Sequence, residues 1–587
     1  MNKVNTKKVI PKCSILFTVM TLNFFLMGQD TNLISSRKQT TSAAEKETKW
    51  SALKVDVNVS FASGSLRYDK DLPPQINQSS KWTAVAWKGE KAHTQLLIWG
   101  KTTKKNIRIV ANDLKDNQGN IISKDAISTG FIQYVMTDEF KGGCGHRKSV
   151  DFDSSMVADI INTEISTVQL TANTVQPVWI SVNVPSNIVA GLYAGTITIE
   201  ADKKYVLNIS LKVIDKTLPT PDKWKYQLDL WQHPAAIARV HGVALWSDEH
   251  FDMMKKYYTM LAGAGQKNIT VSIVDEPWGH QTYDDYPSLI KWIKKKNGEW
   301  KYDYSLFDKY VSFVMSCGIK SRINCYSMVP WKIAFRYFDE ASGKDTVFTQ
   351  GIGTPAYNEF WSVMLKDFTK HLKEKNWFDI TAIAMDERPL EAMQSVIALL
   401  KSIDKDWKIA LAGNYHPEIE NAIDDYCIAS GLQFPAEVLA KRKSQGKIST
   451  WYTCCVEAYP NGFTFSPPDE HVWLGWYTAA KQMDGYLRWA FNSWTKDPLT
   501  DSRFTAWPAG DTYQVYPGPL SSIRFEKLIE GIQDFEKIQI LKNDYKINNQ
   551  VNKLNELEAA LKNFEIKKLS SSSAEKMLAD VNKLVNE

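Results

Sequence analysis

Residues 226–494 repeat one pattern, in which a short apolar run is followed by a stretch whose apolar residues have helical spacing. This alternation is typical of βα units, which build a parallel sheet covered by helices. We read eight apolar runs as strands: YQLDLW from residue 226, NITVSIVD from 268, SRINCYS from 321, DITAIAMD from 379, KIALAG from 408, DYCIAS from 425, ISTWYTC from 448 and GYLRWAFNSW from 485. Eight strands with helices between them predict a (β/α)8 TIM-type barrel, a fold that typically needs about 250 residues.

Two helices of this region have recognisable ends. The segment SLFDKYVSFVMSCG has Ser305 in the position of an N-cap and Gly318 after its last turn. The segment PLEAMQSVIALLKSI begins at Pro389, a residue favoured at the first helical position. We therefore expect helices to begin at these two points, each between two barrel strands.

The N-terminal part of the chain has a different pattern. Short runs that alternate apolar and polar residues are separated by turn residues, among them KAHTQLLIWG, KNIRIVANDL, QPVWISVNVP, GLYAGTITIEA and KKYVLNISLKVID. They predict an N-terminal all-β sandwich over residues 50–216, with one short helical candidate at residues 156–161. The prolines of TLPTPDKW mark its end, so the barrel is predicted over residues 222–545. The Lys- and Glu-rich residues 546–587 predict a helical tail with a solvated face.

The first residues have the features of an export signal. Four lysines precede a short apolar core, SILFTVMTLNFFLMG, at residues 14–28. Because a membrane span needs about 20 residues, we expect residues 1–28 to be a signal peptide and the mature chain to have no integral membrane span. An uncleaved anchor is the alternative. Residues 29–49 are predicted to be a flexible leader, and the protein to be exported, whether periplasmic, cell-surface or secreted.

Charge and cysteine content narrow the class of protein. A net charge of +5 on 587 residues, without a basic stripe, argues against nucleic acid as a partner. The seven cysteines form no CxxC pattern, and Cys144 near His146 supplies only two possible zinc ligands. Adjacent Cys454 and Cys455 have awkward geometry for a bond with each other. We therefore predict structural cysteines, no metal and no cofactor.

The carboxyl ends of the eight predicted strands are where a barrel of this kind carries its active site. Aromatic, amide and carboxylate side chains gather there, and the chain as a whole has 21 Trp and 24 Tyr. Flat aromatic faces stack on sugar rings, although they also fill cores, so this rim favours a polyol substrate such as a glycan. The predicted substrate-binding residues are Trp231, His233, Asp275, Glu276, Tyr326, Asn414, Tyr415, Trp451, Tyr452, Arg488, Asn492 and Trp494.

Two adjacent Asp-Glu pairs end predicted strands, Asp386–Glu387 in TAIAMDERPLEAM and Asp275–Glu276 in ITVSIVDEPWG. Neighbouring residues of a strand point to opposite faces, so an adjacent pair can serve one substrate only if the strand bends there. Such a pair suits substrate-assisted glycoside hydrolysis, in which one carboxylate orients the 2-acetamido group and the other transfers protons. The ordinary alternative is that these carboxylates only stabilise helix N-termini.

Several segments carry a family resemblance. The segments AIAMDERP, INCYSMVPW, IVDEPWGHQTYDDY, WYTCC and DGYLRWAFNSWTKDPLTDSRFTAWPAGDTYQVYPG resemble the catalytic domain of glycoside hydrolase family 123, and QPVWISVNVPSNIVAGLYAGTITI is similar to its β-sandwich companion. That family has been described as β-N-acetylgalactosaminidases. The resemblance implies a retaining, substrate-assisted enzyme in which Asp386 stabilises the acetamido group and Glu387 is the general acid/base.

Two alternatives stay open at this point. The chain can be a glycan-binding protein whose barrel no longer turns over substrate. It can also be a glycosidase of different sugar specificity that uses Asp275 or Glu276 together with Glu387 across the barrel.

Overall fold

The computed structural model describes residues 41–140, 143–145, 148, 152 and 155–587, of which residues 42–587 form one compact unit. The predicted signal peptide and most of the predicted leader lie outside the described residues. Among the described residues, no helix combines the length and the apolar character needed to cross a membrane.

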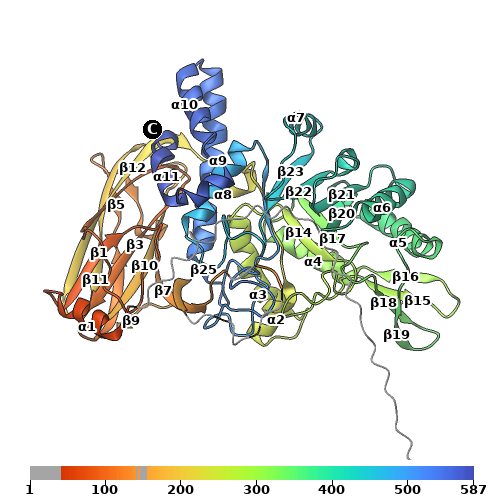
Figure 1. Ribbon diagram of the computed structural model, residues 1–587, viewed down its shortest axis with the longest axis horizontal. Coiled ribbons are helices and arrows are strands. Elements are labelled where there is room, and N and C mark those ends of the chain that lie inside the picture. The colour runs from red at the N-terminus through yellow and green to blue at the C-terminus, as the bar shows by residue number, and fades with distance from the viewer. Residues whose placement is uncertain (1–40, 141–142, 146–147, 149–151, 153–154) are drawn as a thin grey trace, which may run out of the picture. The chain divides into compact units, whose positions relative to one another are not determined.

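The N-terminal domain is a sandwich of two sheets, as the alternating pattern predicts (Figure 1). One sheet has the order β1 (Val57–Ala62), β3 (Lys91–Gly100), β10 (Thr174–Asn183), β7 (Ile127–Thr137), β8 (Ser155–Asn162) and β25 (Ser521–Ser522). The other has the order β2 (Lys81–Lys88), β12 (Lys204–Thr217), β11 (Gly191–Glu200), β4 (Lys104–Ala111) and β9 (Val168–Leu170), with β5 (Leu114–Lys115) and β6 (Ile121–Ile122) beside β11. Alternate residues of both sheets face inward and form one apolar core, for example Leu96 and Ile98 opposite Ile197 and Leu211.

Two local predictions for this part of the chain are wrong. Residues 156–161 are not helical but belong to β8, which pairs with β7 along its length. The last residues of the predicted leader are not flexible, because α1 (Ala43–Ser51) begins there with a capping box between Ser42 and Glu45. This helix is anchored by Trp50, which is buried in an apolar cluster with Leu97.

The second domain is an eight-stranded parallel barrel, and all eight strands lie where the sequence predicts them. Their order is β13 (Gln227–Leu230), β24 (Gly485–Arg488), β23 (Ile448–Tyr452), β22 (Asp425–Ala429), β21 (Lys408–Gly413), β20 (Thr381–Asp386), β17 (Arg322–Tyr326) and β14 (Asn268–Ser272). The barrel is nearly closed, because β13 and β14 are joined largely by side chains. Gln266 Oε1 accepts from Leu230 N at 2.9 Å, and Gln232 Oε1 accepts from Thr270 N at 2.8 Å.

Helices follow most of the strands: α2 (Pro234–His241) and α3 (Asp248–Gly263) after β13, α4 (Ser305–Ser316), α5 (Pro355–Glu374), α6 (Leu390–Ile403), α7 (Ala436–Ser444), α8 (Asp469–Ala480) and α9 (Ile523–Ile547). After β21 the described chain forms only a short 3-10 turn, Glu420–Ala422, so this unit departs from the regular pattern. The N-caps of α4 and α6 are Tyr304 and Pro389, one residue from their predicted positions.

The C-terminal tail continues from α9 as α10 (Val551–Leu561) and α11 (Ala574–Val585). It is more than a solvated helix, because α11 buries Leu578 and Val581 against the body of the protein. Trp87 of the sandwich donates its indole N–H to the Val585 carbonyl at 2.8 Å. The tail therefore joins the two domains.

A small four-stranded sheet was not predicted. Its order is β16 (Trp300–Asp303), β15 (Lys291–Lys294), β18 (Phe335–Asp339) and β19 (Lys344–Phe348) (Figure 1). The hairpin β15–β16 follows β14, and the hairpin β18–β19 follows β17. Both hairpins therefore begin at the carboxyl ends of barrel strands, and the loops that lead into them border the site described next.

Candidate active site

The strand bends at the pair Asp386–Glu387, at the second of the two residues. Within β20, Ala382 and Ala384 face the barrel interior, so the alternation also turns Asp386 inward. Glu387 should then point outward, but its φ is +49°, a left-handed conformation that is uncommon for residues other than glycine. Its N–H still pairs with the Ala412 carbonyl of β21 at 2.7 Å. The bend lets two adjacent carboxylates serve one side of the barrel.

The carboxylate of Asp386 is held by a residue that sequence reasoning did not select. Trp331, from the loop between β17 and β18, donates its indole N–H to Asp386 Oδ2 at 3.1 Å. The guanidinium of Arg388 lies over the Trp331 ring, 4.3 Å from its centroid, and donates from Nε to the Asp386 carbonyl. Burial, followed by the charge of Glu387, raises the pKa of Asp386 to about 7, against the opposing effects of Arg388 and the Trp331 N–H.

Glu387 has a different donor. The Tyr452 hydroxyl, at the carboxyl end of β23, donates to Glu387 Oε1 at 2.7 Å. Tyr452 was selected from the sequence as a sugar contact, and the structure places it on the proton-transferring candidate instead. The two carboxylates thus come from one turn but are held from two directions, and this difference allows them to play different roles.

The second pair, Asp275–Glu276, has the same backbone feature, since φ of Glu276 is +48°. Its carboxylates are occupied by the loop that follows. Glu276 accepts from the backbone N–H groups of His280 and Tyr286, and Asp275 Oδ1 accepts from Ser288 N at 2.8 Å. This pair shapes the loop after β14, so the geometry favours the pair at 386–387 for chemistry.

Aromatic side chains line the mouth of the barrel beside the pair. The rings of Trp231, Trp278 and Tyr326 lie 4.9–5.0 Å apart, centroid to centroid. They pack in one cluster with Tyr452 and the inward alanines of β20 and β21. Small alanines in the strands leave room that large side chains would fill. Trp231 Nε1 is buried without a partner among the described residues, which is unusual for a buried donor.

His233 lies buried, where its ring does not take up a proton near pH 7. Its ring stacks on Tyr286 at 3.6 Å and contacts Ser493 Oγ at 3.0 Å. Burial lowers the pKa of His233 to about 3, so the ring is neutral near pH 7. Asn492 accepts from the His233 N–H and donates to its carbonyl, which makes Asn492 a backbone clasp and not a substrate contact.

Three further selected side chains point away from the site. Trp451 and Trp494 are fully buried in the main core, where their N–H groups donate to Thr478 Oγ1 and to the Val515 carbonyl. Trp451 precedes the inward Tyr452, so the period of two turns it toward α8. Arg488 is buried in an ion pair with Asp511 at 2.8 Å.

The loop after β21 carries two predicted substrate-binding residues, Asn414 and Tyr415, and neither contacts Asp386 or Glu387 in the structure. Asn414 is exposed, and the Tyr415 hydroxyl donates to Glu420 Oε2 at 3.3 Å. Two half-buried tryptophans at the rim were not selected. Trp489 donates to Asp511 Oδ2 at 2.9 Å, and Trp507 packs edge-on against it at 5.3 Å. Trp331 lies in INCYSMVPW and Trp507 in TAWPAG, both within the segments that carry the family resemblance, and that was the only signal for them.

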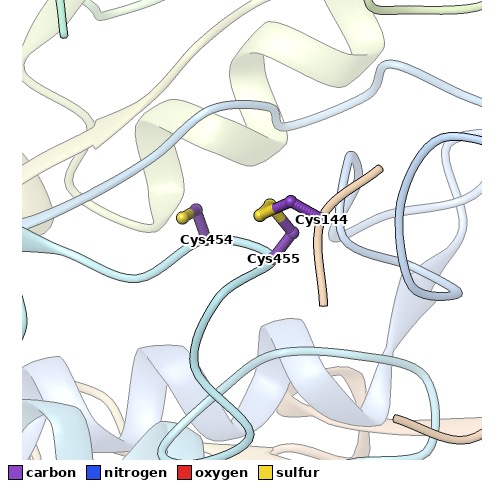
Figure 2. Close-up of side chains that lie close together, drawn as sticks. All are labelled: Cys144, Cys454 and Cys455. Carbon is purple, nitrogen blue, oxygen red and sulfur yellow. A yellow bond between two sulfur atoms is a disulfide. The ribbon is translucent and has the colours of Figure 1, made fainter. Parts of the chain in front are cut away.

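The cysteines near the site form a disulfide. Cys455, after β23, is bonded to Cys144, 311 residues away in sequence, while the neighbouring Cys454 remains a thiol (Figure 2). The bond ties the chain that follows Tyr452 to the segment between β7 and β8. The prediction of structural cysteines fits this pair.

Groups with the donor atoms of a metal site occur twice among the described residues. Cys144, Cys454 and Cys455 form one, and the disulfide occupies two of these sulfurs. Glu276, His280 and Asp285 form the other, where His280 Nδ1 and Asp285 Oδ1 contact each other at 2.8 Å on the exposed loop after β14. Neither of these groups includes Asp386 or Glu387.

Known proteins with the same features are glycoside hydrolases. The family described as "Glycoside hydrolase 123, catalytic domain" matches residues 231–541, and "Glycoside hydrolase 123 N-terminal domain" matches residues 61–201. The structure is similar to that of a family 123 glycoside hydrolase from Clostridium perfringens, studied for glycolipid glycan hydrolysis, with 27% identity, a TM-score of 0.81, and coverage of 90% of this chain and 98% of that one.

A family 39 glycoside hydrolase from Bacteroides cellulosilyticus gives a TM-score of only 0.33 at 11% identity, covering 78% of this chain and 82% of that one. No curated protein matches the sequence. The catalytic-domain match extends over more than half of the chain, and the sandwich, the barrel and the aromatic mouth all agree with it. This chain belongs to glycoside hydrolase family 123.

Proposed function

We propose that this glycoside hydrolase is an exported, retaining β-N-acetylhexosaminidase that removes β-linked N-acetylgalactosamine from glycans by substrate-assisted catalysis. The observation that carries the proposal is the bend at Glu387, which sets two adjacent carboxylates in one barrel mouth under separate donors. The proposed sugar, N-acetylgalactosamine, is inferred from the resemblance to family 123. The glycan of a glycolipid is a candidate substrate, because the relative from Clostridium perfringens was studied for that reaction.

In the first step the acetamido oxygen attacks the anomeric carbon as the bond to the leaving oxygen breaks. Glu387 gives its proton to that oxygen. Asp386 accepts a hydrogen bond from the acetamido N–H and stabilises the positive charge that develops on the acetamido group. The product is an oxazolinium ion joined to the sugar. In the second step Glu387 removes a proton from water, which attacks the anomeric carbon and opens the ring. Two inversions leave the configuration retained.

The scheme requires opposite charge states of two carboxylates that influence each other. Asp386 must be ionised and Glu387 protonated in the reacting complex. Burial and the charge of Glu387 keep the pKa of Asp386 near neutrality, so protonation of Glu387 favours ionisation of Asp386. The alternative with Glu276 as a second catalytic carboxylate has less support, since both of its oxygens accept from the backbone.

Export is part of the proposal. The disulfide Cys144–Cys455 is a bond that forms in oxidising compartments and is rare in the cytosol. Together with the lysines and apolar core of residues 1–28 it supports a periplasmic, cell-surface or secreted protein.

A paired set of aryl and natural β-glycosides tests the function. Substrates with a 2-acetamido group should be cleaved, while those with a 2-hydroxyl should react at least about 10²-fold more slowly, and product analysis by NMR should show retention. Cleavage of both sets at equal rates excludes acetamido participation. A thiazoline analogue of the oxazolinium ion should inhibit competitively.

The pair of variants Glu387→Gln and Glu276→Gln assigns the acid. Glu387→Gln should lose about 10²–10⁴-fold in kcat on natural glycans, and less on aryl glycosides with good leaving groups, because loss of a general acid costs rate in this range. Glu276→Gln keeps a matched left-handed residue in place and should change mainly thermal stability. The assignment fails if Glu387→Gln retains full activity on natural glycans.

A further inference from the structure

Trp331 connects three segments at the barrel mouth: the loop after β14, its own loop after β17, and the end of β20. Its backbone N–H donates to the Pro277 carbonyl at 2.8 Å, which ties it to the loop after β14. Its own loop follows β17 and leads into β18. Its indole N–H reaches Asp386 at the end of β20. The side chain is nonetheless 44% exposed, so core packing alone does not explain an aromatic residue of this size here.

The ring is fixed on one face. The Arg388 guanidinium lies over it at 4.3 Å, a cation–π distance, and Arg388 is itself held by the carbonyl of Asp386. Trp331, Arg388 and Asp386 therefore form a closed set of three contacts: indole N–H to carboxylate, guanidinium to ring, and guanidinium to backbone. A carboxylate in such a set has a fixed rotamer before substrate arrives.

We propose that Trp331 is a positioning residue for the reaction, whose indole N–H orients Asp386 and favours its ionised form for the acetamido group. The inference rests on the proposed substrate-assisted function. Trp331 supplies the one side-chain hydrogen bond that Asp386 makes among the described residues, and this bond leaves Oδ1 free for the acetamido N–H. An appended loop, and not the barrel itself, thus sets the orientation of the stabilising carboxylate.

Other groups around Asp386 do not replace this bond. Glu387 opposes ionisation of Asp386, and Arg388 favours it through charge. Tyr326 of β17, Cys427 of β22 and Tyr452 of β23 also face it, and the pKa of each is raised, first by burial and partly by Asp386, so all three stay neutral. Among the described residues, only the Trp331 N–H donates directly to the Asp386 carboxylate, and an indole donor does not titrate.

The test uses Trp331→Phe, which keeps an aromatic ring but removes the donor. Because a hydrogen bond to a charged group strengthens ionisation, its loss should move the acid limb of kcat/KM upward, by as much as about one pH unit. The kcat for a 2-acetamido aryl glycoside at pH 6 should fall about tenfold, while KM changes less than about threefold. In an Asp386→Asn background, the same substitution should change kcat by less than about twofold.

Trp300→Phe is the matched control, because Trp300 lies in β16 of the small sheet, has Lys294 over its ring and should leave the pH profile unchanged. A Trp331→Phe protein with the wild-type acid limb and kcat overturns the proposal. An equal tenfold loss in the Asp386→Asn background also overturns it, since the effect then does not act through Asp386. If wild type cleaves no 2-acetamido glycoside, the proposed function fails instead.

Fluorine NMR gives a readout that does not depend on activity. In protein labelled with 5-fluorotryptophan, the Trp331 resonance, assigned by its absence in Trp331→Phe, should shift as pH passes through neutrality. That shift should vanish in Asp386→Asn. A Trp331 resonance that titrates equally in both proteins shows that the indole does not report on Asp386, and the proposal falls.

Discussion

Gly413 lies directly against the backbone of Glu387: a Cβ at Gly413 would come within 3.2 Å of the Glu387 Cα. The two residues end neighbouring strands, and the Glu387 N–H pairs with Ala412, the residue before this glycine. Gly413 itself has φ of +156°, at the edge of the region that favours glycine. The left-handed turn that presents the carboxylates of Asp386 and Glu387 therefore depends on the absence of a side chain at Gly413 of β21.

Substitution of Gly413 should consequently damage activity more than stability. In Gly413→Ala the new methyl displaces the turn, and a misplacement of this kind costs about 10–10²-fold in kcat/KM. Gly431→Ala is the control, because a Cβ there meets nothing within 4 Å. Steady-state kinetics and thermal unfolding of both variants check this expectation, and a fully active Gly413→Ala protein contradicts it.

The acid limb of the pH profile should belong to Asp386. Burial and the charge of Glu387 raise the pKa of this carboxyl to about 7, but the scheme needs Asp386 ionised while Glu387 is still protonated and therefore uncharged, so kcat/KM should rise with pH along a limb that lies below about 7. In Asp386→Asn this limb should be absent, and the residual activity should be low and nearly flat over the same range. A limb of unchanged position in Asp386→Asn would assign it to another group.

The same group should make stability depend on pH. Since the folded-state pKa is raised from about 3.8 to about 7, the folded protein binds this proton more tightly than the unfolded chain, and the group stabilises the fold less as pH rises through that window. Asp386→Asn should therefore be more stable than wild type at pH 8, by about 1–3 kcal/mol after allowance for partial solvation. At pH 4 the difference should be small. Denaturant unfolding at the two pH values measures it.

The disulfide should contribute to stability and be detectable chemically. Opening Cys144–Cys455, by reduction or in Cys144→Ser/Cys455→Ser, frees the chain after β23 and should cost about 2–5 kcal/mol. Alkylation of unfolded protein without reductant should label four of the six cysteines of residues 41–587, and all six after reduction. Reductant should not lower the unfolding temperature of the double variant. Six labelled cysteines in the untreated protein would show that the bond is absent.

Asp159 lies at the centre of a buried ion network between the sandwich and the barrel, so the stability of the fold should depend on its charge. This β8 carboxylate pairs with Arg524 of α9 at 2.9 Å and with Arg67 at 3.0 Å. Burial raises the pKa of Asp159, but the two guanidiniums offset it and leave the pKa below its ordinary value, so the stabilisation is present near neutral pH and is lost as pH falls toward the lowered pKa.

Asp159→Asn leaves two buried guanidiniums without their carboxylate and should cost about 3–5 kcal/mol in denaturant unfolding near pH 7. Asp215→Asn removes an exposed partner of Lys88 and serves as the control, with no measurable loss. Equal stability of the two variants would show that the network does not hold the domains together.

Much of the fold follows from local pattern. The period of two in the first domain, and the alternation of apolar runs with helical spacing in the second, specify the sandwich and all eight barrel strands, because each pattern buries one face of one kind of element. The predictions of secondary structure were wrong where contacts with other parts of the chain determine the conformation. Residues 156–161 form a strand because they pair with β7. The helix at residues 43–51 is held in place because Trp50 is buried in an apolar cluster.

The site divides in the same way. The sequence by itself determined that Asp386 and Glu387 stand at the end of a barrel strand among aromatic residues, since strand ends and residue types are local facts. The tertiary structure decided which way each side chain points: the left-handed turn against Gly413, the indole of Trp331 on Asp386, the burial of Trp451 and Trp494, and the disulfide across 311 residues. The physical reason is that orientation, burial and charge state are set by groups distant in sequence, which no local period encodes.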